Sequence, residues 1–85
     1  MNIEFKKVCD DLCRKVDDFA KKGDYRPEKM PEYEVRPFIN MIEEIPDPEL
    51  VTTLKGLPER LLRFIGIHSP TTCNRLNGLL RGTRR

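Results

Sequence analysis

The chain has no tryptophan, a single histidine, and no apolar run that approaches the ~20 residues a helix needs to cross a bilayer. A membrane-spanning segment is therefore not expected. Its three cysteines are an odd number with two of them four residues apart, which does not describe a disulfide scaffold and favours a reducing compartment. We predict a cytoplasmic protein with no membrane contact.

Sequence patterns that carry known chemistry are also missing. There is no glycine-rich phosphate loop, no Gly-x-Ser-x-Gly elbow and no acidic cluster spaced to hold a metal. A helical chain of 85 residues has little room for a pocket of about 300 Å3, the lower end for ligand sites. We therefore expect neither enzyme activity nor a cofactor.

Zinc is the metal for which ligand types are present. Thiolate and imidazole are its usual ligands, and the sequence offers four of them: Cys9, Cys13, His68 and Cys73. Their spacing matches no zinc motif, and cysteines on an apolar stripe ordinarily act as small hydrophobic residues. We favour structural cysteines and predict no metal site.

Charge is distributed unevenly along the chain, although the net charge is only +2. Residues 1–56 hold ten basic and thirteen acidic side chains, whereas residues 57–85 hold six arginines and one acid. Arginine presents a planar fork of donors that suits phosphates and base edges. The basic end of the chain, including the tail 82–85, therefore suggests nucleic acid, and a solvated or acid-binding tail is the alternative.

Apolar spacing predicts a single all-α domain of about five helices with no sheet. The clearest helix is 3–22, whose apolar residues recur at intervals of three and four: Phe5, Cys9, Leu12, Val16 and Phe19. This stripe suits one side of an intramolecular bundle, and a homodimer through helix 3–22 is the alternative. Shorter helices are expected at 37–45, 48–55, 58–65 and 70–81, because proline is tolerated at a helix start.

Between the first two helices, residues 24–36 are polar and contain two prolines. We predict a long loop here with room for one helical turn, and this loop wraps over the core or binds a partner. The residues predicted to contact a partner are two tyrosines in this loop and two acids after it: Tyr25, Tyr33, Glu43 and Glu44.

The last third of the chain has the layout of two short helices joined by a glycine-containing turn. Gly66 would take a positive φ in that turn, Ile67 would plug the corner, and Ser69 would cap the second helix. With these residues, segment 58–81 resembles the helix-turn-helix of SOS-response repressors, in which glycine, an apolar residue, a polar residue and Ser-Pro open the second helix. The stretch 71–78 is also similar to LacI-type repressors.

This resemblance implies that the second helix enters the major groove of DNA, with Thr71, Asn74 and Arg75 facing the bases. Position 72 is threonine, where families with a shorter turn usually bury an aliphatic residue. We predict a small regulatory protein that binds nucleic acid. Further arginines would contact phosphates: Arg60, Arg63, Arg81, Arg84 and Arg85.

The alternative function is a protein-interaction module. Such a module would be an adaptor or inhibitor that docks on a larger protein, of the kind found in phages and mobile elements, and would have no nucleic-acid activity. The uneven charge and the long loop suit this alternative equally well.

Overall fold

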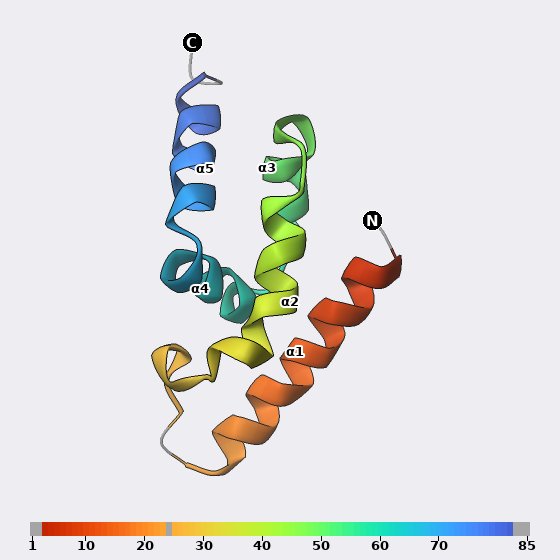
Figure 1. Cartoon of the computed structure of the whole chain (residues 1–85), viewed down its shortest axis with the longest axis vertical. Coiled ribbons are helices and arrows are strands. Elements are labelled where there is room, and N and C mark those ends of the chain that lie inside the picture. The colour runs from red at the N-terminus through yellow and green to blue at the C-terminus, as the bar shows by residue number, and fades with distance from the viewer. Residues whose placement is uncertain (1–2, 24, 83–85) are drawn as a thin grey trace.

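The computed structural model describes residues 3–23 and 25–82, and over this part of the chain the fold is all-α without any strand, as predicted. The elements are α1 (Ile3–Lys21), the 3-10 turn η1 (Pro27–Lys29), α2 (Glu32–Glu43), α3 (Asp47–Lys55), α4 (Glu59–His68) and α5 (Pro70–Gly82). Figure 1 shows α1 and α5 on opposite sides of α2 and α3, with α4 lying below α5 beside the lower part of α2. None of the described helices is both long and apolar enough to cross a membrane.

The core forms where α1, α2 and α4 meet. α1 buries its predicted stripe through Phe5, Cys9, Leu12 and Val16, and it packs mainly on α2 and α4. The ring of Phe5 stacks on that of Phe38, with the centroids 6.2 Å apart. The stripe is therefore used inside the chain, as the bundle interpretation expects, and the residues proposed for a homodimer seam are already covered.

The predicted long loop at 24–36 is wrong over residues 32–36, which are helical, whereas residues 25–31 contain only one short helical turn. η1 occupies part of it, and α2 begins at Glu32, five residues before the expected start at Pro37. Pro37 lies inside α2 and removes one helical hydrogen bond. Two features offset this loss: Val35 is fully buried, and Arg36 forms an ion pair with Glu32 one turn earlier. That contact with Arg36 also lowers the pKa of Glu32.

Candidate functional site

The corner between α4 and α5 differs from the predicted helix-turn-helix corner. α4 continues through Gly66 and Ile67 to His68, so that Ser69 alone separates the two helices. Among the described residues, Gly23 has the only positive φ, so Gly66 does not make the predicted turn. Ile67 is 39% exposed and therefore does not fill the space between the two helices, contrary to the prediction. The prediction of a glycine turn at this position is wrong.

Proline sets the position of the break. The residue before a proline is disfavoured in the helical region because the ring clashes with its backbone. Ser69 precedes Pro70 and has φ −140° and ψ 75°, outside the helical region. Its backbone N–H still donates to the Ile65 carbonyl at 2.9 Å, which closes the last turn of α4.

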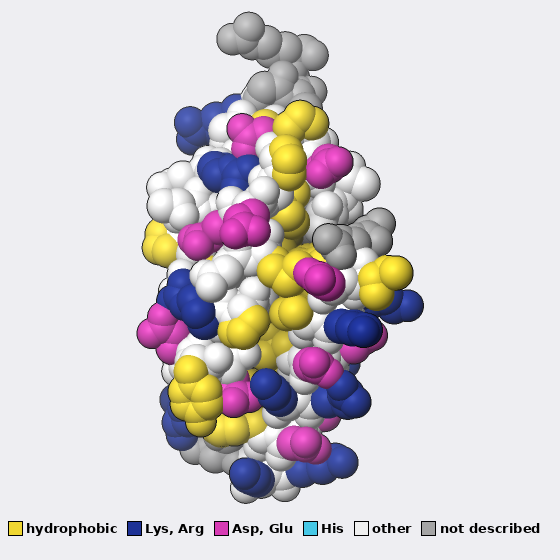
Figure 2. Space-filling model, turned by 45° about the vertical axis from the view of Figure 1, so that its right-hand side comes forward, with side chains coloured by type: hydrophobic (Ala, Val, Ile, Leu, Met, Phe, Trp, Pro, Cys, Tyr) yellow, Lys and Arg dark blue, Asp and Glu magenta, His cyan; other side chains and the backbone are white. Residues whose placement is uncertain are grey.

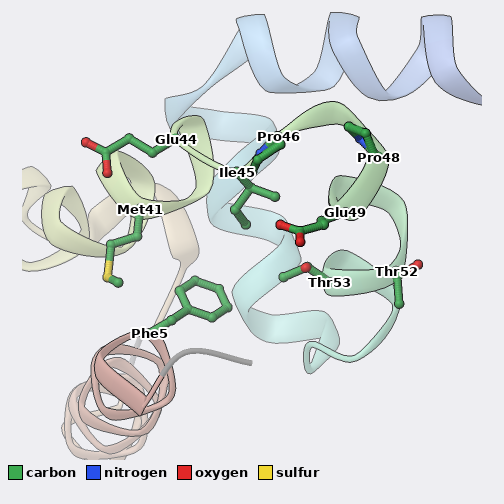
Figure 3. A pocket seen from close by; sticks show the side chains of 9 residues that line it. All are labelled: Phe5, Met41, Glu44, Ile45, Pro46, Pro48, Glu49, Thr52 and Thr53. Carbon is green, nitrogen blue, oxygen red and sulfur yellow. The ribbon is translucent and has the colours of Figure 1, made fainter.

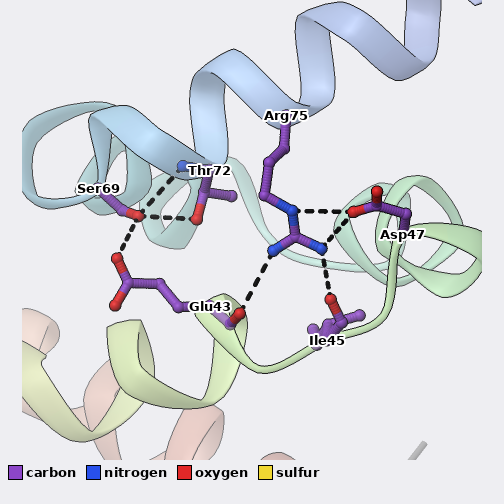
Figure 4. A network of polar contacts seen from close by, with 6 residues as sticks. All are labelled: Glu43, Ile45, Asp47, Ser69, Thr72 and Arg75. Atoms are coloured by element: carbon purple, nitrogen blue, oxygen red, sulfur yellow. Dashed lines mark hydrogen bonds and ion pairs between the residues drawn. The ribbon is translucent and has the colours of Figure 1, made fainter.

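Ser69 forms the N-cap of α5, as predicted. Its hydroxyl accepts from the backbone N–H of Thr72 at 3.4 Å and donates to Glu43 Oε2 at 2.9 Å (Figure 4). Thr72 Oγ1 lies 2.7 Å from the same hydroxyl, and both side chains are fully buried. Thr71 also donates to Glu43, at 3.4 Å. Glu43 therefore lies at the positive end of α5, where a carboxylate is favoured.

Arg75 forms hydrogen bonds to both sides of the turn between α2 and α3, which consists of residues 44–46 and is called the α2–α3 joint below. Its Nε and Nη2 donate to Asp47 Oδ1 at 2.9 and 2.5 Å, and its Nη2 and Nη1 donate to the carbonyls of Ile45 and Glu43 at 2.6 and 3.3 Å (Figure 4). Carbonyls at a helix end have no partner within the helix, so this guanidinium completes the end of α2. The side chain is 29% exposed, and the residue predicted to face bases is thus bonded within the chain.

Two of the arginines predicted for phosphates belong to α4. Arg60 pairs with Asp17 of α1 at 2.7 Å, and Arg63 lies 3.8 Å from Glu59 on its own helix. Cys13 and Asp17 next to Arg60 raise its pKa. Arg60 lies in the first turn of α4, whereas α5 starts beyond the last turn, so Arg60 and the first turn of α5 are separated by most of the length of α4.

The remaining predicted nucleic-acid contacts lie on α5 or after it. Asn74 and Arg81 are exposed on α5. Arg84 and Arg85 lie outside the described residues, and of the predicted basic tail only Gly82 is described, as the last residue of α5. The nucleic-acid contacts of these side chains stay a prediction.

The four residues predicted for a partner fall into two pairs. Tyr25 packs edge-on against Phe19, with the ring centroids 5.8 Å apart, and burial raises the pKa of its phenol. Glu43 is bonded to the start of α5, as described above. Tyr33 and Glu44 are exposed, at the first turn and the end of α2 respectively.

The four potential zinc ligands do not form a cluster. No group of three acidic, histidine or cysteine side chains in residues 3–23 and 25–82 is placed to hold a metal. Cys9 is buried in the core, where burial raises the pKa of its thiol to about 11. All three cysteines are free thiols.

The structure contains a groove that sequence reasoning missed. It has a volume of about 600 Å3 and lies between α1 and the α2–α3 joint (Figure 3). Apolar side chains line much of it: Phe5 from α1, Met41 from α2, Ile45 and Pro46 from the turn between α2 and α3, and Pro48 from the first turn of α3. The expectation of no pocket on the 300 Å3 scale is wrong, because this space lies between elements and not within the core.

Polar residues complete the groove. Glu49, Thr52 and Thr53 come from α3, and Glu44 comes from the end of α2. In Figure 2 a continuous apolar stripe runs down this face of the molecule, with acidic side chains on both sides of its upper part. The sequence signal for the groove was the spacing of Met41 and Ile45, which are four residues apart. In the structure both are half-buried, and Ile45 lies beyond the end of α2.

Comparison with known proteins assigns the chain to no family and to no function. No protein-family model, no curated protein and no solved structure matches the chain. Function is therefore inferred from the geometry of the chain itself.

Proposed function

We propose that the protein is a small helical interaction module that docks on a larger protein through the groove between α1 and the α2–α3 joint. The observation that carries this proposal is an apolar groove of about 600 Å3 in a chain of 85 residues. Its volume falls within the usual range for binding sites, roughly 300–1,000 Å3. Three free cysteines are consistent with a cytoplasmic location, which we also propose.

The apolar residues of the groove connect the core with the surface. Phe5 is a core residue whose ring packs on Phe38, whereas Met41 and Ile45 pack against the core and remain half-buried at the groove surface. Contiguous apolar surface in a small protein commonly marks a place where another molecule binds. The stripe in Figure 2 is such a surface, and it runs along one face of the molecule.

The first turns of α5 favour a protein partner over nucleic acid. Glu43 contacts Ser69 and Thr71, and Asp47 contacts Arg75, so two carboxylates lie where a phosphate backbone would approach. Nucleic-acid binding depends on cations that neutralise phosphates. A helix with these carboxylates against its first turns is poorly suited to that role.

A display selection of helix-forming peptides against the full chain tests the proposal. We expect selected peptides to bind the native chain and to lose at least about tenfold in affinity against Met41→Asp, because a carboxylate would be buried in the groove. Tyr33→Asp is the matched control, since Tyr33 is 75% exposed and does not line the groove. Circular dichroism establishes that both variants fold.

Two results would contradict the proposal. One is a set of selected peptides that bind native chain and Met41→Asp equally. The other is salt-dependent binding to duplex DNA that Arg81→Ala weakens and Met41→Asp leaves intact, which would support the α5 surface instead.

A further inference from the structure

We infer that the groove binds an amphipathic helix whose apolar face is flanked by lysine or arginine. This inference rests on the proposed function and names the chemistry of the partner. Three observations carry it: the shape of the groove walls, the negative charge at the groove, and the unfavourable position of Glu44 at the end of α2.

The groove walls are formed by the end of α2 with the turn that follows it, and by one face of α3. Met41 lies in the last turn of α2, and Glu44 and Ile45 follow its last residue. Glu49, Thr52 and Thr53 stand at i, i+3 and i+4 on α3. Residues at this spacing share one face of a helix. In Figure 3 Met41, Ile45 and Glu49 surround the same space as Phe5 of α1, whereas the carboxylate of Glu44 points away from Glu49 at the edge of the groove.

Such walls suit a helical partner. Residues 3–23 and 25–82 contain no strand, so an extended peptide would find no sheet edge to pair with in that part of the chain. A docked helix instead uses apolar anchors at i, i+3, i+4 and i+7 and needs only side-chain contacts. It would lie between α1 and α3 and add a helix to the bundle.

Charge at the groove is of one sign. Among its nine described lining residues, Glu44 and Glu49 are the only charged ones. Neither forms an ion pair with another described residue. Interfaces match opposite potentials, so the complementary partner carries positive charge beside its apolar anchors.

The position of Glu44 is not explained by the fold. It is the C-cap residue of α2, where the helix dipole disfavours a negative charge. Glu49, in the first turn of α3, has a favourable local role, but Glu44 has no ion pair with any other described residue. A cationic side chain of a partner would relieve this unfavourable charge.

The same charge argues against a symmetric dimer through two grooves. A two-fold axis would bring Glu44 and Glu49 of one copy close to the same residues of its partner, and like charges in an interface are unfavourable. Phosphate-bearing ligands are disfavoured for the same reason. A separate basic helix remains as the occupant that fits both shape and charge.

Three designed 18-residue peptides test the inference. They share one leucine face at i, i+3, i+4 and i+7 and differ only in the flanking residues, which are lysine, glutamine or glutamate. We expect the lysine peptide to bind the full chain about tenfold tighter than the glutamine peptide at low salt, and the glutamate peptide to bind least tightly. Raising the salt concentration should narrow these differences, because exposed charges are screened.

The variant Glu44→Gln/Glu49→Gln should abolish the preference for lysine while still binding the glutamine peptide. Asp18→Asn/Glu28→Gln is the control with the same net charge, since both of its residues are exposed and away from the groove. It should keep the full preference.

The results of these peptide experiments distinguish a failure of the charged-partner inference from a failure of the proposed docking function. Equal affinity for all three peptides, with loss of binding in Met41→Asp, overturns the charged-partner inference and leaves the groove as a docking site. Absence of binding by every peptide, or binding that Met41→Asp does not change, overturns both. Sedimentation that shows self-association of the chain, removed by Met41→Asp, assigns the groove to a second copy and overturns the inference.

Discussion

The two sides of the α2–α3 joint use the same residue types in opposite ways. On the side that faces α5, Glu43 and Asp47 are bonded to Ser69 and Arg75. On the side that faces α1, Glu44 and Glu49 lie beside an apolar groove without an ion pair to any described residue. Neighbouring acids thus form bonds within the chain on one side and lie at an open surface on the other. The contacts of Arg75 with Asp47 and with the carbonyls of Glu43 and Ile45 are called the Arg75 clamp below. A cluster of acids in a sequence does not by itself show which role each acid has.

Of the substitutions that test this difference between the two sides, removal of Arg75 should cause the largest loss in the free energy of unfolding. Arg75→Ala leaves Asp47 and the carbonyls that end α2 without their donor, and we expect a loss of about 2 kcal/mol in the free energy of unfolding. Urea denaturation followed by circular dichroism measures it. Arg81→Ala, on the exposed part of the same helix, should change stability by less than about 0.5 kcal/mol. Equal effects of the two substitutions would show that the clamp contributes nothing.

The adjacent pair Glu43 and Glu44 gives a smaller and sharper test. Glu43→Ala removes the acceptor of the buried Ser69 hydroxyl and should cost about 1 kcal/mol in the free energy of unfolding. Glu44→Ala removes a carboxylate from the negative end of α2 and should be neutral, or stabilising by up to about 0.5 kcal/mol. Urea denaturation compares the two directly. A larger loss of unfolding free energy in Glu44→Ala than in Glu43→Ala would contradict the conclusion that Glu43 is the bonded acid and Glu44 the acid at the groove.

The smallest effect concerns α1, the wall of the groove opposite the joint. Burial raises the pKa of Cys9 to about 11, so its thiol stays protonated at pH 8, and iodoacetamide should modify the half-buried Cys13 and Cys73 first. In the unfolded chain Cys9 ionises at lower pH than in the folded chain. The stabilisation that comes from burying the neutral thiol of Cys9 is therefore present at neutral pH and is lost as the pH rises toward 11. Mass spectrometry after timed alkylation checks the order, and rapid modification of Cys9 would show that α1 is loosely packed.

Local features of the fold could be predicted from the sequence because they depend on neighbouring residues. The stripe of α1 and the Ser69 cap before Pro70 both follow from spacings of four residues or fewer. The preference of proline for the first turn of a helix placed the predicted start of α2 too late, at Pro37. Burial of Val35 and the pairing of Glu32 with Arg36 extend that helix, and the first of these depends on tertiary packing.

The candidate site could not be predicted because it depends on contacts between distant parts of the chain. Arg75 and Asp47 are 28 residues apart, and no local pattern joins them. An exposed arginine on a helix suits either a base or a distant carboxylate, and only the packing of α5 on α3 decides between the two. The groove likewise depends on how α1 crosses α2, which apolar spacing does not specify.

The Arg75 clamp also bears on the entropy of binding at the opposite face. Its donors fix the carbonyl of Ile45 and the carboxylate of Asp47, which flank Pro46, a residue of the groove. A ligand that enters therefore meets a wall whose backbone is already ordered, and little conformational entropy is lost on that wall when the ligand binds. Arg75 would thus favour affinity at a surface that its own side chain does not line.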